Sequence, residues 1–159
     1  MAIGLDMEKL IWNESDFEKM GWHDCKIYAL AFKDEDFELM LDIDYILKWV
    51  NPEGSKTHFK FWVAPATLVF RNVWDLKIDL ESSLNLEIQD LHRENPRSPK
   101  NVNHVEESTE YDWKIETHNG EITFKSVGFK LYLRNDPVLL DTQKIEQKER
   151  GGISFEIMP

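Results

Sequence analysis

The stretch KIYALAFKDEDFELMLDIDYIL, residues 26–47, decides the fold. In its second half, residues 37–47, apolar side chains occupy every other position and polar residues such as Asp42 and Asp44 lie between them. A two-residue period is that of a β-strand, because successive side chains of a strand point to opposite faces. The acidic run KDED separates this half from the alternating run at residues 26–33 and suits a tight turn. The stretch therefore predicts two antiparallel strands joined as a hairpin.

The same period continues along the chain. Residues 57–63 and 66–80 predict two further strands, and we expect a bend or an edge at Pro65 because proline has no N–H to donate. Residues 84–92 predict another strand. The segment YDWKIETHNGEITFKSVGFKLYL, residues 111–133, predicts a hairpin that turns at Asn119-Gly120, two residues that tolerate positive φ.

Three other segments depart from this pattern or complete it. Residues 14–20 predict a short helix that Asn13 or Ser15 caps and that Gly21 ends in a left-handed conformation. Residues 93–108 carry prolines and serines without a period and predict a surface loop. Residues 138–152 fit neither period, and GISFEIM at the end of the chain predicts a closing strand.

About eight antiparallel strands without crossover helices define the expected fold class. The chain should be mainly β, an antiparallel β-sandwich or a partly closed barrel with one short N-terminal helix. A length of 159 residues fits a single domain, residues 1–159. The sequence leaves sandwich and barrel open.

Charge and cysteine content limit the function classes. The net charge of −11 repels phosphate backbones, which argues against nucleic-acid binding, and residues 1–53 carry 13 acidic against 5 basic residues. Such a surface favours a basic protein partner, although it also serves solubility. The lone Cys25 cannot form an intrachain disulfide, so we expect a cytoplasmic protein. No run of 18 apolar residues predicts a membrane span, the first residues do not fit a signal peptide, and a homodimer is expected only on general frequency.

A carboxylate pair and a His–Asp pair are the first candidate site residues. Asp42 and Asp44 share one face of their strand about 7 Å apart, which suits a solvated acidic face, a contact surface for a basic partner, or a shared divalent cation. His23 and Asp24 lie at the start of the neighbouring strand, and Asp24 could fix the tautomer of His23. Cys25, flanked by apolar residues, is expected to pack as a small hydrophobe.

Tryptophans are the second kind of candidate. Trp62 belongs to the stretch FKFWVAPATLVF, residues 59–70, which has aromatic residues on both faces. Together with Trp49 and Trp74 it could line a ligand cavity or form an interaction surface, with core packing as the alternative. No compact metal motif, phosphate-binding loop or nucleophile motif is present in the sequence, so we expect no cofactor, no bound metal and no catalytic residues.

The chain also resembles a family of small, uncharacterised bacterial proteins. The shared motifs are a W-H-D-x-x-I opening at Trp22, His23, Asp24 and Ile27, the strand residues from Leu39 to Tyr45, the block from Phe61 to Leu76, and Glu149 to Ile157. A looser similarity, covering about a third of the chain, links the His-Asp opening and LVFRNVWDLKI to immunity proteins of bacterial polymorphic-toxin systems. That similarity implies a small acidic protein that binds a cognate toxin, and it assigns no functional residue.

Three functional hypotheses follow. The first is a non-enzymatic protein that binds a macromolecule, conceivably a toxin, through Asp42, Asp44, Trp49 and Trp62. The second is a small-molecule-binding β-barrel with aromatic walls. The third is a metal-dependent enzyme that uses His23, Asp24, Asp42 and Asp44.

Overall fold

The computed structural model describes residues 9–81, 85–99 and 109–157. The elements are β1 (Ile11–Asn13), the 3-10 helix η1 (Glu14–Lys19), β2 (Lys26–Lys33), β3 (Glu38–Val50), β4 (Lys60–Arg71), β5 (Trp74–Leu80), β6 (Ile88–Arg97), β7 (Glu110–Thr117), β8 (Gly120–Ser126), β9 (Gly128–Leu133), β10 (Val138–Leu140) and α1 (Gln147–Arg150).

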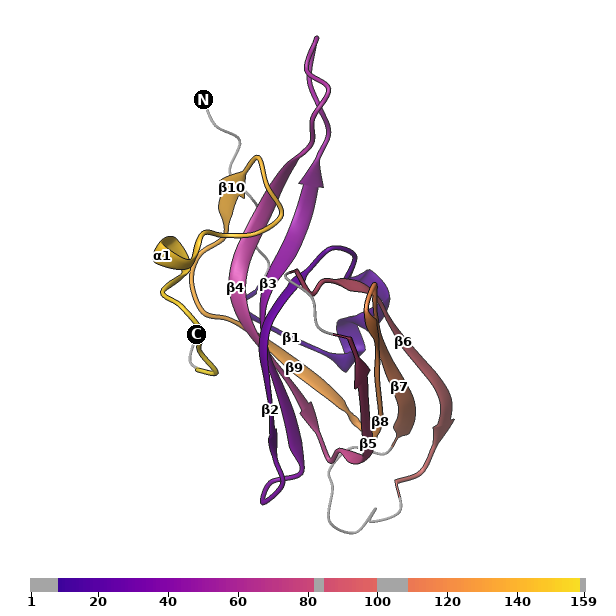
Figure 1. Cartoon of the computed structure of the whole chain (residues 1–159). Helices are drawn as coiled ribbons and strands as arrows, with labels where there is room; N and C mark the ends of the chain where they lie inside the picture. Colours follow the sequence, from indigo (N-terminus) through magenta and orange to yellow (C-terminus); the bar gives the residue numbers. More distant parts are fainter. Residues whose placement is uncertain (1–8, 82–84, 100–108, 158–159) are drawn as a thin grey trace.

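The strands form two antiparallel sheets. Sheet A has the order β1-β9-β4-β3-β2, with β10 also paired to β4, and sheet B has the order β5-β8-β7-β6. The two sheets face each other in Figure 1 as a sandwich, and neither closes into a barrel within the described residues. The predicted mainly β, antiparallel fold is confirmed, and of its two alternatives the structure is consistent with the sandwich, with ten strands in the described residues where about eight were expected.

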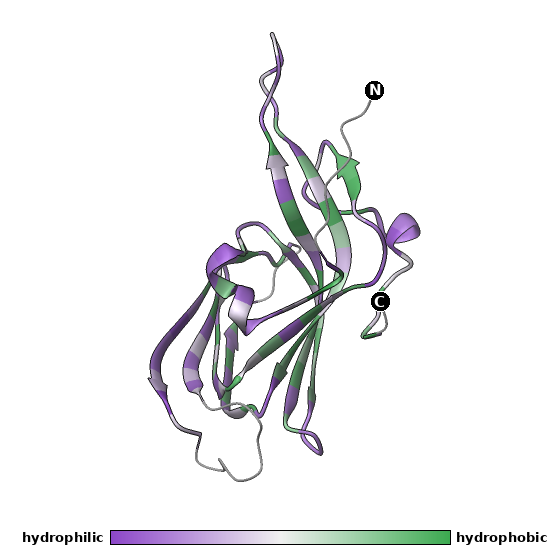
Figure 2. Cartoon of the chain, turned by 180° about the vertical axis from the view of Figure 1, so that it is seen from behind, coloured by the Kyte–Doolittle hydropathy of each residue, from purple (hydrophilic) through white to green (hydrophobic). Residues whose placement is uncertain are grey.

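The core lies between the inner faces of the sheets. Leu39, Leu41 and Ile43 of β3 are fully buried, as are Trp113 and Ile115 of β7. Figure 2 shows hydrophobic residues along the strands and hydrophilic residues at the turns and on α1. The two-residue period therefore predicts correctly which side chains of these strands face the core.

The hairpin of β3 and β4 is longer than the sandwich and projects beyond it in Figure 1. Pro65 does not break the strand, because β4 is continuous, but the expected edge is present on the side of β4 between its pairing with β9 and its pairing with β10. The Pro65 carbonyl accepts a hydrogen bond from the Arg134 backbone N–H at 2.9 Å, on the side of β4 where the chain has left β9 and has not yet entered β10. The missing N–H therefore falls in a gap of the ladder, where it costs no strand pairing.

Sheet A is covered on its outer face by the C-terminal segment, residues 141–157, which we call the strap. The strap follows β10 and contains α1. The predicted closing strand GISFEIM is wrong for residues 152–157, which pair with no strand, and residue 158 lies outside the described part. Side-chain contacts, described below, hold the strap on the sheet.

The predicted helix cap is present, but the predicted helix end and the predicted loop differ from the structure. Asn13 caps η1, as predicted, by accepting a hydrogen bond from the Ser15 N–H at 2.9 Å. Gly21 does not end the helix in a left-handed conformation, because η1 ends at the extended residue Met20. Residues 93–97 of the predicted loop belong to β6, and residues 100–108 lie outside the described part.

The predicted hairpin is confirmed for β7 and β8, but its turn is formed by His118 and Asn119. The rest of the predicted second arm, residues 128–133, forms β9 in the other sheet. Gly120 opens β8 with φ +132°, and a Cβ there would lie 1.9 Å from the Asp79 carbonyl oxygen. Glycine is therefore required by the close approach of β5.

Candidate functional site

Asp42 and Asp44 lie on the outer face of sheet A and are completely buried. They alternate along β3 with Leu41 and Ile43, which enter the core, so the predicted shared face is correct. The predicted solvent exposure of that face is wrong, because the strap covers it. Both carboxylates are therefore enclosed between β3 and the end of the same chain.

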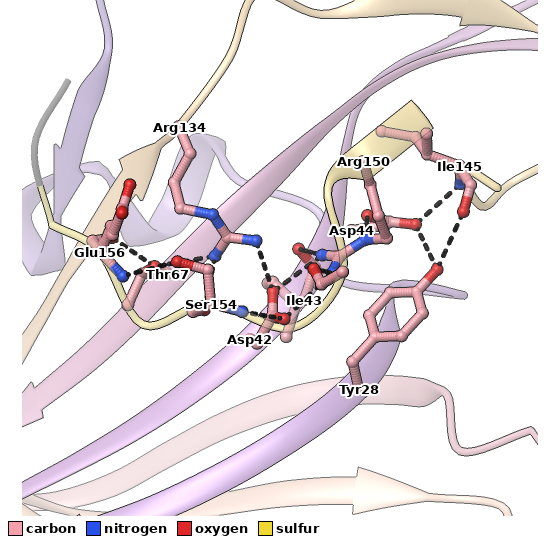
Figure 3. Close-up of polar contacts among 11 residues, drawn as sticks. Tyr28, Asp42, Ile43, Asp44, Thr67, Arg134, Ile145, Arg150, Ser154 and Glu156 are labelled. Atoms are coloured by element: carbon pink, nitrogen blue, oxygen red, sulfur yellow. Dashed lines mark hydrogen bonds and ion pairs between the residues drawn. The ribbon is translucent and has the colours of Figure 1, made fainter. Parts of the chain in front are cut away.

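Two arginines neutralise the buried carboxylates (Figure 3). Arg150 of α1 places Nη2 2.7 Å from Asp42 Oδ1 and Nε 3.1 Å from Asp44 Oδ1, and its side chain is fully buried. Arg134, which follows β9, places Nη2 2.7 Å from the same oxygen of Asp42. We call these four residues the ion cluster. Its two negative and two positive charges balance, as a buried group of charges requires.

Hydrogen bonds from the strap complete the ion cluster. The backbone N–H of Ile145 donates to Asp44 Oδ2 at 2.8 Å, and that of Ser154 donates to Asp42 Oδ2 at 3.0 Å. The Tyr28 hydroxyl donates to Asp44 at 2.7 Å, and burial together with this bond raises the pKa of Tyr28. The ion cluster thus fastens the strap to sheet A and presents no open carboxylate surface to a partner or a substrate.

Three other predicted residues, His23, Asp24 and Trp49, meet near the end of β3, at a place that we call the corner. His23 stacks on Trp49 with ring centres 6.2 Å apart, and its Nε2 lies 3.4 Å from Asp24 Oδ1. Trp49 makes edge contacts with Phe59 at 5.8 Å and Phe61 at 5.0 Å. The corner consists of these five residues, and Trp49 and Phe59 are 40% and 41% exposed.

A pocket of about 280 Å³ adjoins the corner. It lies between sheet A and the start of the strap, and its lining residues are Asp24, Lys26, Phe61, Glu87, Asp141, Thr142, Gln143 and Lys144. Gln143 Nε2 donates to Asp24 Oδ2 at 2.5 Å and so ties the strap to the beginning of β2. Asp24 itself adopts a left-handed conformation with φ +68°, which aspartate tolerates better than most residues.

Trp62 does not join the corner. It pairs with Lys48 and Leu139, whereas the adjacent Phe61 pairs with Trp49, so the two neighbours point to opposite faces of the hairpin. Sequence alone could not separate them, since both faces of this stretch carry aromatic residues.

Metal chemistry finds no support in the geometry. Within the part of the chain that the structure describes, no group of three or more His, Cys, Asp or Glu side chains could hold a metal ion. The carboxylates of Asp42 and Asp44 are engaged by arginines, so His23 and Asp24 do not converge with them on a common ligand position. Cys25 is fully buried, as predicted, and burial raises the pKa of its thiol to about 12.

Sequence reasoning missed an acidic surface on the outer face of sheet B. Strand register places four carboxylates opposite one another across all four strands, and this acidic row consists of Asp79, Glu121, Glu116 and Asp90. Like charges directly opposite in a sheet are unfavourable, so the arrangement is not explained by sheet stability. In the sequence, each of these residues is an ordinary polar position of an alternating strand. Their alignment becomes visible only from the registers of the pairs β5–β8, β8–β7 and β7–β6.

The whole outer face of sheet B is negative. It carries eight carboxylates against four cations, which are three lysines and Arg97, with His92 and Thr123 between them. A hollow of about 440 Å³ lies on this face, and among the described residues no segment covers it in the way that the strap covers sheet A. This acidic face is formed by β5 to β8 and contains none of residues 1–53, in which the sequence had indicated an acidic surface.

Comparisons with known proteins found no matching family model, no matching curated protein and no matching solved structure. None of the helices in the described residues has the length and apolar character needed to cross a membrane.

Proposed function

We propose that this is a non-enzymatic protein that binds a basic protein partner, with the corner as its anchor and the acidic face of sheet B as the source of electrostatic attraction. The observation that carries the proposal is the exposure of Trp49 at the centre of a group of contacting rings. The looser similarity to immunity proteins makes a toxin one candidate partner.

The anchor argument rests on the packing of the corner. Trp49 is held by contacts with His23, Phe59 and Phe61, yet 40% of its surface remains open. A large side chain that is fixed before binding loses little conformational entropy when a partner covers it. Tryptophan is also among the residues that most often dominate the energy of protein interfaces.

The electrostatic argument rests on distribution as well as on net charge. The chain carries −11, and an excess of four negative charges lies on the outer face of sheet B. Such a field increases the association rate of a basic protein and loses most of its effect when salt shortens the screening length. The anchor and the charged face therefore have separable kinetic effects.

Binding kinetics to the basic proteins encoded beside the gene test the anchor. Trp49→Ala should raise the dissociation rate by roughly 30-fold or more, corresponding to a hot spot of at least about 2 kcal/mol. Phe59→Ala should raise it less, and Phe32→Ala is the matched control, because Phe32 is also 41% exposed but precedes the β2–β3 turn of the same sheet. An equal loss with Phe32→Ala, or unchanged dissociation with Trp49→Ala, would contradict the anchor.

The charged face is tested separately by the association rate. Asp79→Asn combined with Glu121→Gln should slow association several-fold at low salt and leave dissociation nearly unchanged. The difference from the wild type should shrink at about 1 M salt, where the screening length is about 3 Å. If neither the substitutions nor added salt changed the association rate, the acidic face would have no part in binding.

A further inference from the structure

The pocket beside the corner has two walls with the same pair of charges. The start of β2 contributes Asp24 and Lys26, and the first residues of the strap contribute Asp141 and Lys144. Each of these segments thus presents one carboxylate and one ammonium group, and the lining also includes the aromatic residue Phe61. The pocket holds charges of both signs close to an apolar surface.

The strap wall is fixed in place before any ligand arrives. Gln143 donates to Asp24 at 2.5 Å, and the backbone N–H of Ile145 donates to Asp44 at 2.8 Å. Lys60 of β4 lies 3.9 Å from Asp141. These contacts hold both sides of the strap wall, so a ligand would meet a largely pre-formed site, which lowers the entropic cost of binding.

The charges of the pocket lining restrict which ligands it can accept. Lys26 and Lys144 both belong to the lining and offer two ammonium groups to a ligand carboxylate. Burial and the charge of Lys144 lower the pKa of Lys26, whereas the charge of Glu87, also in the lining, raises it. A plain anion would meet Asp24, Glu87 and Asp141 as well, and a plain cation would meet the two lysines. A ligand that carries both charges avoids either conflict.

The size of the pocket limits the ligand further. About 280 Å³ lies just below the usual range for drug-sized ligands and suits a molecule of roughly ten non-hydrogen atoms. We propose that the pocket binds a small zwitterion of the amino-acid class, with its carboxylate toward Lys26 and Lys144, its ammonium toward the acidic side chains, and its apolar part on Phe61. This site is separate from the protein-docking proposal and does not depend on it.

Titration of the wild-type protein with each of the twenty L-amino acids, followed by amide chemical shifts, tests the proposal. At least one amino acid with an apolar side chain should saturate in the millimolar range or below, with shifts centred on the pocket. Acetate and methylamine, which carry one charge each, should bind at least ten-fold more weakly. Absence of saturation by all twenty amino acids, or acetate binding as tightly as the best of them, would overturn the proposal.

Variants of the strap wall make the test specific. Lys144→Met should weaken binding of the best amino acid at least ten-fold, and Lys144 is exposed, so the fold should survive the change. Lys148→Met is the matched control, because Lys148 is an exposed lysine of the same strap outside the pocket lining. Equal affinity in the two variants would overturn the assignment of Lys144. No protein partner enters these measurements, so their failure is distinguishable from failure of the docking proposal.

Discussion

The outer faces of the two sheets carry the same kind of ion pairs in opposite surroundings. On sheet A, Arg150 binds Asp42 at 2.7 Å under the strap, and both side chains are fully buried. On sheet B, Arg97 binds Asp112 at 2.8 Å, and about a third of each side chain remains exposed. The N···O distances of the two pairs are nearly equal, so a difference in what the pairs contribute to stability comes from their exposure to water.

Solvent decides what each face can do. A buried pair has lost its hydration, so removal of one partner leaves an uncompensated charge in a medium that cannot solvate it. An exposed pair is screened, and its loss exposes a charge that water accepts. The charges of sheet A are therefore committed to holding the strap, whereas those of sheet B remain available to a partner.

The largest expected effect comes from removing one partner of the buried ion pairs on sheet A. Arg150→Met should lower the free energy of unfolding by about 3–5 kcal/mol, because Asp42 and Asp44 would lose the guanidinium that they share. Lys125→Met is the control on sheet B, where Lys125 contacts Asp75 at 2.9 Å and is 28% exposed, and it should cost less than about 1 kcal/mol. Urea unfolding measures both values, and comparable losses would show that the two faces do not differ as described.

A second substitution on the covered face compares the contribution of Arg134 to stability with that of Arg150. Arg134→Met removes hydrogen bonds to Asp42, to the Thr67 hydroxyl at 2.8 Å and to the Ser154 carbonyl at 3.0 Å, but it leaves Asp42 paired with Arg150. The loss should therefore be about 2 kcal/mol, the range of hydrogen bonds that involve a charged group. The double variant with Arg150→Met should show strong non-additivity in urea unfolding, since both arginines share one carboxylate. Additive losses would mean that the two arginines act independently.

The contrast between the faces also explains what the sequence could and could not predict. Alternation in residues 26–33 and 37–47 predicts strands and their apolar face because that information is local. The burial of Asp42 depends on Arg150, which is 108 positions away, and nothing near Asp42 indicates it. An isolated strand pattern shows that two carboxylates share a face, but it does not show what covers that face.

The acidic row was hidden for a different reason. Asp79, Glu121 and Glu116 each look like ordinary surface residues, and their alignment depends on the registers between β5, β8 and β7. A shift of one residue in either register would place the charges on different faces. The corner was partly predictable, since His23, Asp24 and Trp49 were candidates, but the separation of Trp62 depends on the hairpin register.

Titration sharpens the contrast between buried and exposed groups. Burial raises the pKa of the Cys25 thiol from 9.0 to about 12, so the thiol ionises in the unfolded chain first. The corresponding stability is complete below pH 9 and falls as the pH rises from 9 to 12, by about 1.4 kcal/mol at pH 10. Cys25→Ala should make the decline between pH 8 and 10 shallower in urea unfolding, with the raised pKa values of Tyr28 and Tyr45 acting at higher pH. An unchanged slope would contradict the burial of the thiol.

The exposed counterpart is Glu116 on sheet B. A hydrogen bond from His92 lowers the pKa of Glu116, so any stabilisation that it provides is present at neutral pH and is lost as the pH falls below about 4.5. Both side chains are 44% exposed, and Glu116→Gln should leave the urea midpoint at pH 7 unchanged within error, because the lost bond to His92 offsets the relieved repulsion from Glu121 and Asp90.

The last expected effect is small and has the opposite sign. Glu121 lies directly between Asp79 and Glu116 in the acidic row, and Lys114, its cationic neighbour, is 3.9 Å away. Glu121→Gln should raise the free energy of unfolding by about 0.2–1 kcal/mol at low salt, because it removes two like-charge contacts for one weak pair. The gain should disappear at about 1 M salt, where the screening length falls to about 3 Å.

Asp112→Asn is the control for this sign, because Asp112 accepts hydrogen bonds from Asn95 and Arg97 that hold the pKa of its carboxyl below the ordinary value. That variant should lose stability under the same low-salt conditions. If Glu121→Gln also lost stability, the attraction of Lys114 would outweigh the repulsion along the row. The face of sheet B would then neutralise itself, as the ion cluster of sheet A does, and would have no excess field with which to attract a basic partner.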